Sequence, residues 1–145
     1  TQGYSSAASD VYKRQIKDRL CRVEMSIRDN LKRGTIEMIL LHLLEEEDKY
    51  GYQLSQDLEK ESEGEYQLNE ATMYPTLYRL KKNGFLEERK VQVVGKRFRV
   101  YYHLTESGKQ HLEETKAQYK QVCASIEKVM SYRDRVKAAG KKANK

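Results

Sequence analysis

The stretch "LNEATMYPTLYRLKKNGFLEE", Leu68–Glu88, contains the residues that begin, build and end one helix. Asn69 is a good N-cap, because its side chain can accept a hydrogen bond from a free amide of the first turn. Met73, Leu77 and Leu80 recur at the spacing of one buried helix face. Asn83-Gly84 is typical of a left-handed helix end. The pattern predicts a helix over Asn69–Asn83, and its outward face would carry Thr72, Tyr74, Thr76, Arg79 and Lys82.

A hairpin is predicted directly after this helix. Its strands, "FLEERKVQVV" (85–94) and "KRFRVYYHLT" (96–105), flank Gly95. In the second strand alternate residues are apolar, which is typical of a strand with one buried face; these are Phe98, Val100, Tyr102 and Leu104. Basic residues gather around the hairpin, and they are Arg89, Lys90, Lys96, Arg97 and Arg99.

Two further helices are predicted before the quoted stretch. "GTIEMILLHLLEEEDK" begins at Gly34, and its apolar residues form the buried stripe of a helix that should end at the acidic run Glu45–Asp48. "YGYQLSQDLEKESEGEY" follows after a very short turn, and Leu54 and Leu58 lie on one of its faces. The predicted order is therefore three helices, two strands and one long helix.

The long helix begins at the cap Thr105 and is predicted to run to residue 139. Its apolar residues recur at threes to fours and at sevens, which resembles a coiled-coil seam, although Lys116 and Arg133 interrupt it. We interpret it as a dimerisation helix. The expected contact residues are Leu112, Tyr119, Val122, Ile126 and Val129, and residues 140–145 are expected to form a basic, frayed tail.

This order predicts a mainly α fold with a small β-hairpin (α+β): a winged helix-turn-helix over residues 25–104, followed by the dimerisation helix over 105–139. The second helix of a helix-turn-helix enters the DNA major groove, where base edges are distinguishable. In this chain that helix is Asn69–Asn83. Lys96 and Arg97 at the hairpin tip could then reach phosphates or a minor groove. The net charge of +6 permits a nucleic-acid partner without requiring one.

Four motifs resemble the PadR family of transcriptional regulators, and they lie between Arg33 and Leu112. They are "GTIEMILLHLL", "YGYQLSQDLE", "ATMYPTLYRLKKNGFLEE" and "RVYYHLTESGKQHL". The single long C-terminal helix is similar to that of the family's short subgroup. The resemblance implies a homodimeric winged-helix repressor that binds a pseudo-palindromic operator in double-stranded DNA. It also implies release by a small effector, often phenolic or flat and aromatic. Some members stack such ligands on a tryptophan, and this chain has no Trp.

Two alternatives stay open. Tyr119 could line an effector pocket or only pack in the dimer. The chain could also be a protein-interaction module that has kept the winged-helix fold and lost specific DNA binding, although the basic hairpin argues against that interpretation. Selection of an inverted repeat from random DNA would distinguish a regulator from an interaction module.

The sequence offers little for catalysis, metal binding or membrane insertion. It has no glycine-rich phosphate loop and no set of nucleophile, base and orienting acid, so we expect no enzyme and no cofactor. His42, His103 and His111 do not have the spacing of a metal site, and Cys21 and Cys123 do not form a disulfide framework. No apolar run is long enough to cross a membrane. A cytoplasmic location is therefore expected.

The N-terminal segment is predicted to be foreign to the fold. "SSAASDVYKRQ", Ser5–Gln15, resembles the in-frame translation of a transposase adaptor used to prepare sequencing libraries. We interpret residues 1–24 as a non-native, disordered or irregular segment and Met25 as a plausible natural start. A natural disordered tail is the alternative.

Overall fold

The computed structural model describes residues 10–14 and 26–144. The chain divides into two compact units, residues 1–36 and 37–145. Most of the segment 1–24 lies outside the described residues. The part that is described, 10–14, forms an exposed helical turn and not the irregular chain expected there. Five residues without glycine or proline can close such a turn locally.

Helix α2 spans Ile27–Leu43 and begins earlier than the predicted start at Gly34. The cause is a local cap: the Ser26 hydroxyl accepts a hydrogen bond from the Asp29 amide at 3.2 Å. The helix ends before the acidic run that begins at Glu45, as the sequence predicts.

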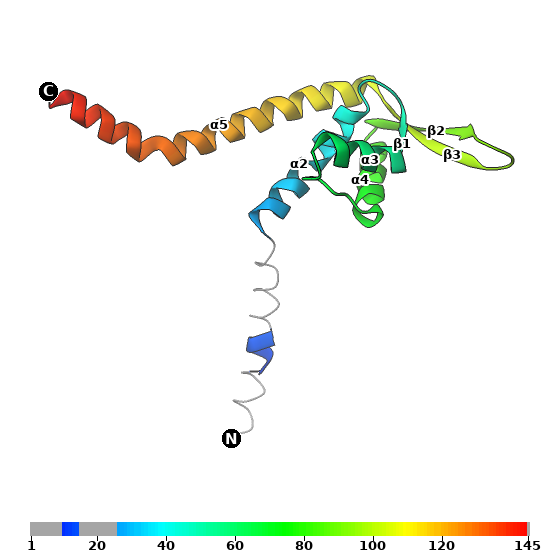
Figure 1. The fold of residues 1–145 in the computed structure, drawn as a ribbon, viewed down its shortest axis with the longest axis horizontal. Helices are drawn as coiled ribbons and strands as arrows, with labels where there is room; N and C mark the ends of the chain where they lie inside the picture. The colour runs from blue at the N-terminus through cyan, green and yellow to red at the C-terminus, as the bar shows by residue number, and fades with distance from the viewer. Residues whose placement is uncertain (1–9, 15–25, 145) are drawn as a thin grey trace. The chain divides into compact units, whose positions relative to one another are not determined.

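The larger unit contains the helix-turn-helix and the sheet, shown in Figure 1. Helices α3 (Gly51–Glu61) and α4 (Glu70–Lys82) follow one another, and strands β2 (Leu86–Gln92) and β3 (Phe98–Leu104) form the predicted hairpin. A two-residue strand, β1 (Lys49–Tyr50), was not predicted. It pairs antiparallel with β3 and gives the sheet order β1-β3-β2. This is the α+β winged-helix architecture that the sequence predicts.

The core of this unit is built from leucines of three helices. Leu40 and Leu41 of α2, Leu54 of α3, and Leu77 and Leu80 of α4 are each 0% exposed. Burying one such side chain fully stabilises a fold by about 1.5–3 kcal/mol. The buried side chains of α2, α3 and α4 therefore hold α4 by its apolar face.

Helix α5 spans Glu106–Ala143 and so continues past the predicted end at residue 139. Alanine and lysine favour helix at this end, and the late lysines Lys141 and Lys142 complement the helix dipole. Within the described chain, no helix is both long enough and apolar enough to traverse a bilayer.

The start of α5 is joined to the turn after α4. The Thr105 amide donates to the Phe85 carbonyl at 3.1 Å, and the Thr105 hydroxyl donates to the Gly84 carbonyl at 2.7 Å. The same hydroxyl oxygen accepts from the Gly108 amide at 3.0 Å, which confirms Thr105 as the N-cap. At Gly108 the backbones are so close that an added Cβ would collide with the Phe85 carbonyl oxygen. These contacts, from Gly84 to Gly108, are called the α4–α5 junction below.

Candidate nucleic-acid interface

Helix α4 has the N-cap and the one buried face that the sequence predicts. The Asn69 side chain accepts a hydrogen bond from the Thr72 amide at 2.9 Å. Met73, Leu77 and Leu80 face the core and are at most 1% exposed. Gly84 has φ 80°, the left-handed conformation expected at this helix end. The opposite face of α4 is therefore presented to solvent in a fixed orientation.

The exposed face of α4 is broader than predicted. Its middle is formed by Ala71, Pro75, Tyr78 and Lys82, which follow one another at helical spacing and are all exposed. Tyr78 is 65% exposed and is the largest apolar ring on this face, yet it was not among the predicted site residues. Its position halfway between Pro75 and Lys82 on the helix surface was the signal that could have identified it.

The prediction that Thr76 faces outward is wrong. Thr76 is 4% exposed. It lies between Met73 and Leu80 on the helix surface, because about 3.6 residues make one turn. Its hydroxyl donates to the Thr72 carbonyl at 2.8 Å, so its polar group is satisfied inside the helix.

Tyr74 is exposed on one flank of α4, as predicted, but part of its ring is covered. The Tyr74 side chain is 44% exposed. It lies over Gly51, the first residue of α3, so closely that an added Cβ there would be 2.8 Å from the Tyr74 hydroxyl. The absence of a side chain at Gly51 thus makes room for the ring and fixes it beside the start of α3.

Thr72 and Arg79 form the other flank of α4, and both are exposed. Arg79 is bound to α2: its Nε donates to Glu37 Oε1 at 2.6 Å. The two residues are 42 positions apart in the chain, so the sequence pattern alone could not pair them.

The hairpin forms a basic wing, as predicted. Lys96 and Arg97 lie at its exposed tip, next to Gly95 with φ 74°. The Gln92 side chain donates to the Gly95 carbonyl at 2.8 Å, and the Val93 amide donates to the Arg97 carbonyl at 2.9 Å. Phe98 is 65% exposed although it continues the apolar alternation of β3. The reason is that this end of the hairpin extends away from α3 and α4 (Figure 1).

The cations of the wing fall into two classes. Two of them, one on each strand, have partners: Arg89 contacts Asp48 at 3.0 Å, and the Arg99 guanidinium lies 4.1 Å from the centre of the Tyr50 ring. The Asp48 carboxylate also accepts a hydrogen bond from His103 Nδ1 at 2.7 Å. Towards the tip, and at the end of α4, the cations form no ion pair among the described residues; these are Lys82, Lys90, Lys96 and Arg97.

Two ion pairs brace the unit behind this surface. Lys49 donates to Asp57 at 2.6 Å, and this hydrogen bond raises the pKa of the Lys49 ammonium. Lys116 of α5 donates to Glu45 at 2.9 Å. That bond raises the pKa of Lys116 and lowers the pKa of Glu45, whose carboxylate also contacts His42.

The predicted dimerisation residues separate into two groups. Leu112 is 1% exposed, so the prediction that it contacts a partner is wrong: it is packed within its own chain near the α4–α5 junction. The other four are exposed on α5, with Tyr119 48%, Val122 58%, Ile126 50% and Val129 74% exposed. Met130 and Val136 are also exposed, at 74% and 51%.

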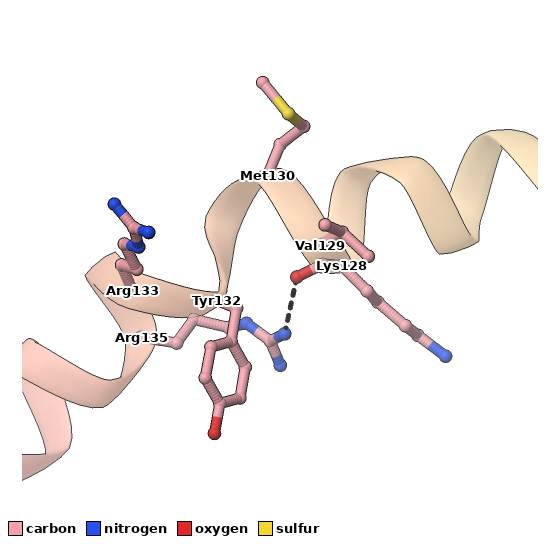
Figure 2. Close-up of a pocket in the computed structure, with 6 residues that line it drawn as sticks. All are labelled: Lys128, Val129, Met130, Tyr132, Arg133 and Arg135. Atoms are coloured by element: carbon pink, nitrogen blue, oxygen red, sulfur yellow. Dashed lines mark hydrogen bonds between the residues drawn. The ribbon is translucent and has the colours of Figure 1, made fainter.

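A hollow of about 680 Å³ lies along the exposed part of α5. Figure 2 labels the residues that line it. The Arg135 side chain turns back and donates to the Lys128 carbonyl at 2.9 Å. All the lining residues come from this one helix: Lys128, Val129, Met130, Tyr132, Arg133 and Arg135. A single helix cannot enclose a small molecule, so this hollow can become a closed site only against another surface.

The histidines and the cysteine make local contacts. His111 stacks on Phe85 with ring centres 4.0 Å apart, and His42 Nδ1 contacts Glu45 at 2.8 Å. A hydrogen bond with Cys123 raises the pKa of the Tyr119 hydroxyl. Across the part of the chain that the structure describes, no three His, Cys, Asp or Glu side chains come together in a possible metal site.

Comparison with known sequences gives one consistent family. The profile described as "Transcriptional regulator PadR-like family" matches residues 40–114. Uncharacterized protein X of Lysinibacillus sphaericus is 33% identical over 104 residues, which cover 72% of this chain and 95% of that protein. Transcriptional regulator YqjI of Escherichia coli is 29% identical over 89 residues, which cover 61% of this chain and only 41% of YqjI.

Solved structures agree. A transcriptional regulator of Clostridium thermocellum matches with a TM-score of 0.66 and 28% identity, over 71% of this chain and 97% of that one. A PadR family regulator of Eggerthella lenta matches with a TM-score of 0.63 and 27% identity, over 86% of this chain and 96% of that one. Bacillus subtilis PadR, solved in complex with operator DNA, matches with a TM-score of 0.51 and 28% identity, over 55% of this chain and 45% of that one.

Proposed function

The chain belongs to the PadR-like family of transcriptional regulators, and on this premise we propose that it is a homodimeric repressor. It binds a pseudo-palindromic operator in the cytoplasm and is released by a small effector. The description of the family, a transcriptional regulator, is the class of function expected from the sequence.

One observation carries the DNA-binding part of the proposal. Among the cations of α4 and the wing, four form neither an ion pair nor a ring contact with any described residue, and they lie at the end of α4 and toward the tip of the wing. They are Lys82, Lys90, Lys96 and Arg97. A winged helix approaches DNA at these two places, with α4 in the major groove and the wing on phosphates or in a minor groove. A cation that is already paired inside the protein has to give up its partner before it binds phosphate. The four cations named here can bind phosphate directly.

The contact residues follow from exposure. Tyr78 in the middle of the outward face of α4 would meet base edges or the adjoining backbone, and so would the residues on its flanks, Thr72, Tyr74 and Arg79. Thr76 is not among them because it is buried. The B. subtilis PadR structure with operator DNA supports the same use of the fold in this chain.

The dimer part of the proposal rests on α5. Tyr119, Val122, Ile126 and Val129 recur along one side of a helix whose second half contains no buried residue. A second copy of the same helix would bury this stripe. In such a dimer the two α4 helices would lie roughly 34–36 Å apart, one turn of DNA.

The effector part follows from the same helix. The hollow lined by the residues labelled in Figure 2 belongs to one helix, and a second α5 would close it. Tyr132 lines it, and Tyr119 lies farther back along α5; tyrosine offers a flat face and one polar handle, which suits a phenolic or flat aromatic ligand.

A selection experiment tests the proposal. The full chain is used to enrich binders from a randomised duplex pool, and the winner is titrated against a scrambled duplex at two salt concentrations. We expect an enriched inverted repeat, a clear preference over the scrambled duplex, and binding that weakens steeply with salt because phosphate contacts supply most of the affinity.

The opposite result would also be informative. Salt-sensitive binding of all duplexes alike, with no enriched sequence, would contradict specific repression. It would favour a winged-helix module that serves protein interaction. Sedimentation of the free chain as a monomer at concentrations well above the operator Kd would contradict the dimer.

A further inference from the structure

The ion pair between Glu37 and Arg79 is unusual among those that join α4 to the rest of the unit. It links α2 to the DNA-facing helix through a single short bond, from Arg79 Nε to Glu37 Oε1 at 2.6 Å. Lys81, on the other flank of α4, contacts Glu88 of β2 at 2.8 Å. Only the first of these two pairs involves an arginine, which can bind a base with two parallel hydrogen bonds.

The Arg79–Glu37 pair is poorly placed to stabilise the fold. The Arg79 side chain is 58% exposed and that of Glu37 is 35% exposed. Exposed ion pairs contribute little to stability, since water screens them and both side chains lose freedom. An acid beside a DNA-binding surface also repels phosphate. Neither the stability of the fold nor general affinity for DNA therefore explains the pair.

The geometry supplies such a reason. A guanidinium has five N–H donors in a planar fork. Glu37 occupies the Nε edge, and the two terminal nitrogens of Arg79 have no hydrogen-bond acceptor among the described residues. Two terminal nitrogens side by side match the O6 and N7 acceptors of guanine in the major groove.

We propose that Glu37 is a positioning residue that orients Arg79 to read a guanine in each operator half-site. Glu37 does not touch DNA in this arrangement. It fixes the plane of the guanidinium before binding, so that less side-chain freedom is lost when the two base contacts form. This inference rests on the proposed DNA-binding function and adds to it the base that one residue reads.

The test compares two alanine variants of the full chain. Glu37→Ala frees Arg79, and Glu88→Ala frees Lys81. Each variant removes one partly exposed acid that is paired with a cation of α4. The Kd of each variant is measured for the selected operator and for a scrambled duplex at one salt concentration. Thermal melting of both variants checks that they fold.

The two variants should differ in specificity and not in general affinity. Loss of an acid should leave binding to the scrambled duplex unchanged or slightly tighter in both. In Glu37→Ala the preference for the operator should fall about tenfold or more, the usual range for a good two-bond contact. In Glu88→Ala the preference should be retained, because Lys81 lies on the other flank of α4 and has no planar fork of donors for an acid to orient.

Repeating the selection identifies the base. With Glu37→Ala, and equally with Arg79→Ala, the requirement for one guanine per half-site should relax, and the double variant should lose no more than Arg79→Ala alone. A preference retained in Glu37→Ala, or equal weakening on both duplexes, would overturn the inference while leaving the proposed function intact. Equal weakening would assign Arg79 to a phosphate. A wild-type chain that selects no operator would overturn both.

Discussion

The two parts of α5 have opposite environments although they belong to one continuous helix. Near the α4–α5 junction, Gly108 and Leu112 are buried within their own chain. Farther along, Tyr119, Val122, Ile126 and Val129 are about half or more exposed. The apolar pattern continues from one part to the other, but only the first part is packed inside the chain itself.

The difference shows which part of α5 is stabilised by contacts within its own chain. The first part of α5 completes the winged-helix unit and should fold with it at any concentration. The second part would bury its apolar stripe only against another molecule. Variants in the first part should therefore change the unfolding of the chain, and variants in the second should change its association.

The largest effect is expected at Gly108. Gly108→Ala places a methyl group against the Phe85 carbonyl oxygen and the Leu104 side chain, and backbone must move to admit it. We expect a loss of about 4 kcal/mol in the free energy of unfolding. Gly140→Ala is the control, because nothing lies within 4 Å of the added atom. It should be neutral or slightly stabilising, as alanine favours helix.

Urea unfolding of the two glycine variants measures this difference. Similar stability in both would show that the backbones at the α4–α5 junction are not in close contact, and the contrast between the two parts of α5 would then lose its main support.

A smaller effect separates Leu112 from Ile126. Leu112→Ala removes a side chain that is 1% exposed and should cost about 3 kcal/mol of unfolding free energy at every protein concentration. Ile126→Ala changes a side chain that is 50% exposed in the protomer. It should leave the dilute chain as stable as before and weaken self-association.

Unfolding at several protein concentrations and sedimentation would measure both quantities. If Ile126→Ala lowered the stability of the dilute chain as much as Leu112→Ala does, the two parts of α5 would not differ in the way described.

The smallest effect concerns the two ion pairs of the winged-helix unit, Lys49 with Asp57 and Lys116 with Glu45. Lys49 and Lys116 both have a raised pKa because each donates to a carboxylate. A lysine with a raised pKa in the folded state stabilises it fully below the ordinary value of 10.5, and this contribution is lost as the pH rises through the folded-state pKa. Lys49→Met should cost about 1 kcal/mol at pH 7 and reduce the loss of stability at high pH.

Lys116→Met should show the same trend more weakly, because the Lys116 side chain is 32% exposed and that of Lys49 only 10%. Unfolding free energies of both variants and the wild type, measured from pH 7 to pH 11.5, would check the order. A stability of Lys49→Met that falls with pH as steeply as the wild type would contradict this role of the ammonium.

Local signals made α4 predictable. Asn69, the spacing of Met73, Leu77 and Leu80, and Gly84 each act within a few residues of their own position, so their roles could be derived from the sequence. The same holds for Thr105 as the cap of α5.

Non-local contacts accounted for what was missed. The two residues of β1 are too few to show an alternation, and their strand forms only because β3 lies beside them. The pairing of Glu37 with Arg79 joins residues 42 positions apart, which no local pattern could bring together. Leu112 continues the apolar spacing of α5, and such spacing cannot distinguish packing within a chain from packing between chains.

Thr76 illustrates a different limit. A threonine next to apolar residues on a helix can be turned outward or buried, because its hydroxyl can bond back to the preceding turn. The prediction placed Thr76 on the exposed face because the residue is polar. Its position next to the apolar residues of the helix places it in the core instead.

The α4–α5 junction has a mechanical consequence. Thr105 and Gly108 hold the first turn of α5 against Gly84 and Phe85, so the angle between α4 and α5 is set within each protomer. In the proposed dimer, each α5 would act as a lever arm with its α4 rigidly attached at the end. A ligand that changed the crossing angle of the two arms by a few degrees would change the separation of the two α4 helices, and the spacing of the operator half-sites would no longer fit.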